Sequence, residues 1–308
     1  MTRRTAVSTL VWAIGAFVLV GLTEAPVSGS STTTSTPTST SAPVNDTSTT
    51  TAQPPVTTTT TRTSLPDPFT SPSVERYLSS LAEVVTAGLY DPATHRTYLF
   101  HPGVKERTAS IAKLDILATL LYQDQRSGAT LSPSRQVLVA RMIEDSDNHA
   151  ANVLWKAEGG ANSVAAFDRV IGFRQTVINT FLGWGLLETT AADQLKLLRA
   201  ITQPNSWLNA ASRRYEMSLM LNVTPSQRFG LGATPGGAVV GVKDGWYPEA
   251  SGWQVNTEGF VRYRGHEYLL SILTMEPPSE QYAINSLNEL CERVFHSLVT
   301  SGWPTSVR

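Results

Sequence analysis

The chain has 308 residues, and only 16% of them are charged, well below the ~25% usual for soluble domains. This low share indicates that part of the chain is not globular. The net charge is −1, and the sequence has no long run of basic residues that would bind nucleic acid. We therefore expect no nucleic-acid partner.

The N-terminal segment, residues 1–29, has the pattern of an export signal. Arg3 and Arg4 precede an apolar run at 10–22, and small residues follow that run. The run is short for a spanning helix of ~20 residues, which favours export over a retained membrane tether. No cysteine lies just after the apolar run, so we expect no lipidated N-terminus. We therefore expect an extracytoplasmic protein, either secreted or associated with the cell envelope.

Residues 30–72 are mostly Thr, Ser and Pro and cannot bury a core, so we predict a disordered linker. The remainder, 73–308, is large enough for one domain stabilised by its hydrophobic core. Cys291 is the only cysteine, which excludes an intrachain disulfide. The histidines show no spacing typical of metal ligands, and we expect a monomer with no metal and no cofactor.

The first part of this domain is predicted to be a helix followed by a hairpin. Apolar residues recur at helical spacing from Val74 to Val85. A short strand at 88–90, a turn at 91–94 and a second strand at 97–100 then form the hairpin.

Helical periodicity dominates residues 110–200, which predicts a block of helices. Strand signals return at 238–242, 252–255 and 266–273, and an amphipathic helix follows at 282–298. Because strands occur at both ends and enclose the helices, the sequence favours an α/β (α+β) fold. We expect one antiparallel sheet assembled from distant segments, flanked by helices and a helical lobe.

The first motif that could carry chemistry is Ser110-x-x-Lys113, which opens an apolar helical run. This spacing puts the serine near a helix N-terminus, with the lysine one turn later on the same face. The helix N-terminus favours negative charge on the serine oxygen, and an amine with a lowered pKa can accept the serine proton. Alone, the pattern also fits a helix cap followed by a solvated lysine.

Two further motifs follow. Ser146-Asp147-Asn148 lies between two helical runs and offers a hydroxyl for proton relay and an amide for orienting a substrate. Lys243-Asp244-Gly245-Trp246 ends a strand and offers a cation, a backbone N–H for an oxyanion hole and a glycine that lets substrate approach. Without a catalytic role, the second motif would be a helix cap and the third the end of a strand. Ser286-Leu287-Asn288 shows that the second pattern also arises by chance.

Together and in this order, the motifs resemble the serine β-lactamase and penicillin-binding-protein superfamily. The pattern is closest to class A β-lactamases, whose set is S-x-x-K, S-D-N and K-T-G. The resemblance covers roughly 73–301 and implies a β-lactamase/transpeptidase-like fold. It also implies an exported serine hydrolase acylated by β-lactams or D-alanyl cell-wall peptides. The alternatives are a catalytically weak module that binds wall peptides or a partner protein, and an esterase of unrelated substrates.

The resemblance also implies roles for individual residues. Ser110 would be the acylated nucleophile and Lys113 its base. Ser146 would relay a proton, and Lys243 would contact the substrate carboxylate and lower the pKa of Lys113. The substrate-binding set would be Asn148, Asp244, Gly245 and Trp246, with the backbone N–H groups of Ser110 and Trp246 as the oxyanion hole.

The sequence departs from class A in three ways. Asp244 stands where the family has a hydroxyl, and it would repel a substrate carboxylate unless it points away. No E-x-x-N follows Asn148, and Glu188 aligns instead with the acid that pins the loop, so we expect slow deacylation. Only 36 positions separate Ser110 from Ser146, which predicts a more open cleft.

Two residues outside the motifs have open roles. Arg228 could bind a substrate carboxylate or lie on the surface. Trp184, like Trp246, could line the cleft or pack in the interior.

Overall fold

The computed structural model describes residues 66–234 and 236–300. The predicted export signal at 1–29 and most of the predicted linker at 30–72 lie outside the described residues. A short 3-10 helix, η1 (Pro68–Thr70), contains the buried Phe69. The folded part therefore begins a few residues before the predicted boundary at residue 73.

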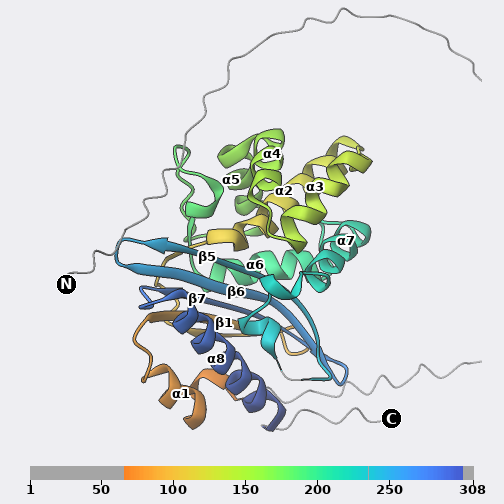
Figure 1. The fold of residues 1–308 in the computed structure, drawn as a ribbon. Helices are drawn as coiled ribbons and strands as arrows, with labels where there is room; N and C mark the ends of the chain where they lie inside the picture. The colour runs from red at the N-terminus through yellow and green to blue at the C-terminus, as the bar shows by residue number, and fades with distance from the viewer. Residues whose placement is uncertain (1–65, 235, 301–308) are drawn as a thin grey trace, which may run out of the picture. The chain divides into compact units, whose positions relative to one another are not determined.

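One antiparallel sheet, in the order β2-β1-β7-β6-β5, joins strands from both ends of the described chain (Figure 1). This arrangement confirms the predicted α/β (α+β) fold, because β1 pairs along its length with β7, from the C-terminal third. The strands are β1 (Val84–Asp91), β2 (Arg96–Phe100), β5 (Val239–Glu249), β6 (Gly252–Tyr263) and β7 (His266–Met275).

The first predicted helix is shorter than the apolar spacing indicated. Helix α1 (Pro72–Leu78) ends at Leu78, and Val84 and Val85 belong to β1. The side chains of Ser79 and Ser80 bond to backbone carbonyls of the last turn, which competes with further helix. The β-branched valines then gain more from pairing with β7 than from a helix.

The predicted block of helices is confirmed and lies against one face of the sheet, while α8 (Glu280–Thr300) and α1 cover the other (Figure 1). The lobe consists of α2 (Ala112–Ser127), α3 (Pro133–Glu144), α4 (Asn148–Glu158), α5 (Gly160–Ile171), α6 (Ala191–Thr202) and α7 (Ala210–Leu221). Within the described ranges, no helix is long and apolar enough to cross a membrane.

Short elements connect the sheet to the lobe. The strands β3 (Glu106–Arg107) and β4 (Glu188–Thr189) pair with each other, beside the 3-10 helices η2 (Ala109–Ile111) and η3 (Trp184–Leu186). Two further 3-10 helices, η4 (Pro225–Gln227) and η5 (Gly230–Ala233), precede β5. The residues of the candidate site lie on η2, α2, α4, η3 and β5 and in the segment between α3 and α4.

Candidate active site

Ser110 lies in η2, directly before α2, so the first motif opens a helix as predicted. The preceding Ala109 has φ +47°, a left-handed conformation that costs a non-glycine residue about 1–3 kcal/mol. Strand β5 passes close by, since a Cβ at Gly245 would lie 2.5 Å from Ser110 N. A glycine is therefore required at 245 for the strand to approach the backbone of the nucleophile.

The amine of Lys113 contacts residues of both the first and second motifs. Its Nζ lies 3.0 Å from Ser110 Oγ, 3.0 Å from Ser146 Oγ, 2.5 Å from the Ser146 carbonyl and 2.8 Å from Asn148 Oδ1. Lys113 is fully buried, whereas Ser110 and Ser146 are partly exposed. The two hydroxyls can therefore meet a ligand, while the amine is covered by the groups around it.

Strand β5 brings the third motif to the same point. The Nζ of Lys243 lies 3.0 Å from Ser146 Oγ and 2.9 Å from the Asp244 carbonyl. Ser146 Oγ thus bridges the two lysine amines. The structure brings all four predicted catalytic residues together, in one chain of contacts that runs from Ser110 through Lys113 and Ser146 to Lys243.

The two buried lysines differ in their electrostatics. Burial, and after it the nearby charge of Lys243, lower the pKa of Lys113 to about 6, against the opposing effect of Asp147. Burial also lowers the pKa of Lys243, to about 8, against the opposing effect of Asp244 and Glu258. Near neutral pH, Lys113 is therefore mostly an uncharged amine that can accept a proton, and Lys243 is mostly a cation.

The carboxylate of Asp244 is not presented to a ligand, contrary to its expected place in the substrate-binding set. Its side chain is fully buried, and Oδ2 accepts a hydrogen bond from Phe229 N at 2.7 Å. The reason is strand alternation, which turns neighbouring side chains to opposite faces, so Asp244 points away from the contacts of Lys243. Burial raises the pKa of Asp244 to about 7. Direct repulsion of a substrate carboxylate is no longer expected.

The remaining predicted ligand contacts lie at the rim of the site. Asn148 is exposed at the start of α4, and Trp246 is partly buried against Phe229, with ring centroids 5.5 Å apart. Arg228 is half-buried, and its Nη2 donates to the Val240 carbonyl at 3.0 Å. Its guanidinium is therefore engaged by the protein's own backbone.

The loop between α5 and α6 is pinned by Asp193 and not by Glu188. Glu188 is exposed in β4. The fully buried carboxylate of Asp193 accepts from the backbone N–H groups of residues 174–176, at 2.7–3.1 Å, and from Lys196 Nζ at 2.8 Å. The motif pointed to Glu188 in β4, whereas the pinning acid stands five residues later, in the first turn of α6.

Replacing Asp193 with asparagine is expected to lower the unfolding free energy by roughly 3 kcal/mol, because Lys196 and several backbone donors lose a charged acceptor. Burial alone would raise the pKa of Asp193, but these donors hold it below its usual value, so the stabilisation is lost as the pH falls. Urea denaturation measures both effects. The exposed Glu188→Gln is the matched control, and an equal loss in the two variants would contradict the assignment.

Trp184 lines the site and does not simply pack in the interior. The Nζ of Lys113 lies 4.7 Å from the centroid of its ring. The indole Nε1 donates to Asn152 Oδ1 at 2.8 Å, and the Trp184 carbonyl accepts from Thr108 Oγ1 at 3.2 Å. The role of Asn152 was not predicted, although it lies one helical turn after the second motif, on α4.

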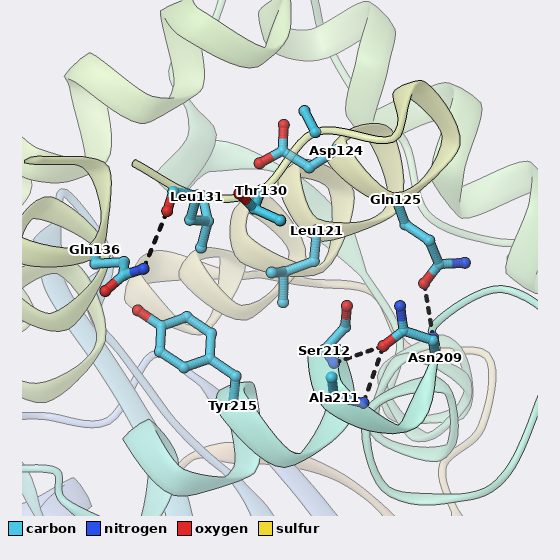
Figure 2. A pocket seen from close by; sticks show the side chains of 11 residues that line it. Leu121, Asp124, Gln125, Thr130, Leu131, Gln136, Asn209, Ala211, Ser212 and Tyr215 are labelled. Carbon is cyan, nitrogen blue, oxygen red and sulfur yellow. Dashed lines mark hydrogen bonds between the residues drawn. The ribbon is translucent and has the colours of Figure 1, made fainter. Parts of the chain in front are cut away.

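A cavity of about 310 Å³ lies away from this site, between the end of α2, the start of α3 and α7 (Figure 2). Polar groups in its wall bond to one another, as Gln136 does to the Leu131 carbonyl and Asn209 N to Gln125. None of the predicted site residues lines it. Among residues 66–234 and 236–300, no group of three or more His, Cys, Asp or Glu side chains could hold a metal ion.

A family model described as the β-lactamase enzyme family matches residues 123–298, more than half of the chain. The chain belongs to this family. The matched span contains Ser146 and Lys243 but begins after Ser110 and Lys113, so the assignment of the first motif rests on the geometry above.

Solved structures of the family share the fold. The TLA-1 extended-spectrum β-lactamase superposes with a TM-score of 0.66 at 18% identity, covering 74% of this chain and 97% of that one. A class A β-lactamase from Bacteroides cellulosilyticus gives 0.64 at 16%, covering 73% and 95%. PBP-A gives 0.63 at 18%, with the same coverage.

A curated relative is the putative lipoprotein LppW of Mycobacterium tuberculosis, which is 25% identical over 195 residues. The alignment covers 61% of this chain and 62% of the relative. The match therefore spans less than two thirds of the relative's length.

Proposed function

We propose that the chain is an exported serine hydrolase of the class A β-lactamase type. In this proposal, Ser110 is acylated by a β-lactam or by a D-alanyl peptide of the cell wall. The observation that carries the proposal is the buried amine of Lys113, 3.0 Å from Ser110 Oγ and joined through Ser146 to the cation of Lys243.

Acylation follows from these contacts. The uncharged amine of Lys113 takes the hydroxyl proton of Ser110 while Oγ attacks the substrate carbonyl carbon. The C–N bond then breaks, and the proton passes from Lys113 through Ser146 to the leaving nitrogen. The backbone N–H groups of Ser110 and Trp246 are the proposed donors to the oxyanion, and Lys243 the partner of a substrate carboxylate.

Deacylation is proposed to be slow. The hydrogen-bond partners of Lys113 Nζ are two hydroxyls, a carbonyl and an amide, and no carboxylate is among them. Glu188 is exposed, and Glu158 is buried at the end of α4 with its pKa raised by burial. General-base assistance contributes roughly 10²–10⁴-fold. An acyl-enzyme without it accumulates, which gives a burst stoichiometric with enzyme and then slow release.

The second candidate function is a catalytically weak module that binds wall peptides or a partner protein. The absence of a carboxylate from the partners of Lys113 favours this alternative, because such a site could retain a ligand without turning it over. The name of the mycobacterial relative, a putative lipoprotein, supports a location at the cell envelope for either function.

Intact mass of the full chain after incubation with benzylpenicillin tests the proposal, with a fluorophosphonate as a second reagent. We expect one acyl adduct, lost in Ser110→Ala. Ser286→Ala is the control, because that serine also precedes an asparagine by two residues but is buried on α8, on the other face of the sheet.

The outcomes separate the functions. Labelling by the fluorophosphonate alone would indicate a serine hydrolase of other substrates. Reversible binding of wall peptides without any adduct would favour the binding module. An adduct that survives Ser110→Ala would show that the nucleophile is elsewhere.

A further inference from the structure

The indole of Trp184 forms the outer layer of the site. The ring is half-buried, whereas Lys113 beneath it is fully buried, with Nζ 4.7 Å from the ring centroid. Two contacts hold Trp184 from different elements: Asn152 of α4 accepts from the indole Nε1, and Thr108 donates to the backbone carbonyl. The cover is therefore built by η3, α4 and the segment before η2 together.

The other sides of the amine are already occupied. Ser110, Ser146 and Asn148 supply four oxygen atoms within 3.0 Å of Lys113 Nζ. These contacts and the indole surround the amine, which agrees with its complete burial. A water molecule can reach Nζ only by displacing one of these groups.

Deacylation needs such a water. The water oxygen must attack the acyl carbonyl carbon while one of its protons passes to a base. The ester C–Oγ bond then breaks, the base returns the proton to Ser110 Oγ, and the carboxylic acid leaves. Lys113 is the base that contacts Ser110 Oγ in this structure, and the indole of η3 covers its Nζ.

We propose that Trp184, held in place by Asn152, keeps the hydrolytic water away from Lys113 and thereby sets the lifetime of the acyl-enzyme. This inference rests on the proposed function and adds the physical cause of the slow second step. Trp184 is a positioning residue that acts through Lys113.

Trp184→Ala tests the proposal through the decay of the penicilloyl adduct, followed by intact mass after excess penicillin is removed. We expect decay to accelerate by roughly 10²-fold, the lower end of general-base assistance, with a smaller effect on acylation. The faster decay should rise with pH as Lys113 becomes uncharged, a dependence that a loss of packing would not produce. Trp184→Phe, which keeps an aromatic cover, should restore slow decay.

Asn152→Leu tests separately the hydrogen bond from the indole to Asn152. It changes an exposed residue of α4, where folding is little affected. We expect its adduct to decay at a rate between the rates of the wild type and Trp184→Ala. Trp207→Ala is the matched control, since Trp207 is a partly buried indole outside the site, before α7.

Unchanged decay in both Trp184→Ala and Asn152→Leu would overturn the inference and leave the proposed function intact. Loss of acylation in folded Trp184→Ala would also overturn it, because the indole would then serve the first step. If Trp184→Ala does not fold, the decay rates of Asn152→Leu and Trp184→Phe test the inference instead. No adduct in the wild type would remove the proposed function first, and this inference with it.

Discussion

Replacing Lys113 with methionine is expected to slow the acylation of Ser110 by roughly 10²–10⁴-fold, the contribution of a positioned general base. Methionine fills a similar volume without the amine, so the loss isolates the base from the packing. The effect should be large because Lys113 Nζ is the one basic group in contact with Ser110 Oγ among the residues that the structure describes.

Stopped-flow acylation with a chromogenic β-lactam measures this loss, and Lys156→Met, at an exposed position of α4, is the control. Lys113→Met should unfold at the same temperature as the wild type or at a higher one. The folded protein holds Lys113 largely uncharged at neutral pH, which costs stability that a methionine does not cost. Acylation at the wild-type rate would show that another group activates the serine.

The sheet and the block of helices were predictable because their signals are local. Periods of two and of 3.6 residues are readable without knowing the partners. The end of the first helix was not predictable, since Val84 and Val85 continue the apolar spacing of α1 and become strand residues only by pairing with β7. That pairing joins residues as far apart in the chain as Val84 and Met275, which no local pattern reveals.

Some residues of the candidate site were likewise predictable from the sequence, and others were not. Motif order indicated Ser110, Lys113, Ser146 and Lys243, and the structure brings these four together. The direction of Asp244 depends on the phase of β5, which the motif does not specify. Asp193 was missed, and the role of Trp184 stayed open, because their partners lie elsewhere in the chain. These partners are the loop at 174–176 for Asp193, and Asn152 and Lys113 for Trp184.

The rate of acylation is expected to follow a bell-shaped pH profile with limbs near pH 6 and pH 8. Below about pH 6, Lys113 holds a proton and cannot take that of Ser110, so the rate falls by about tenfold per pH unit. Above about pH 8, Lys243 loses its charge and with it the attraction for a substrate carboxylate. Because the charge of Lys243 lowers the pKa of Lys113, the position of the acid limb depends on both lysines.

Lys243→Met separates the two limbs. Without the neighbouring cation the pKa of Lys113 rises, so the acid limb should move to higher pH, and the alkaline limb should disappear. At pH 6 the variant therefore loses activity twice over, through a protonated base and through a weaker hold on the substrate. The exposed Lys105→Met is the control and should keep the wild-type profile. An acid limb that stays near pH 6 in Lys243→Met would mean that burial alone sets the pKa of the base, and that the contact between the motifs serves only to position Ser146.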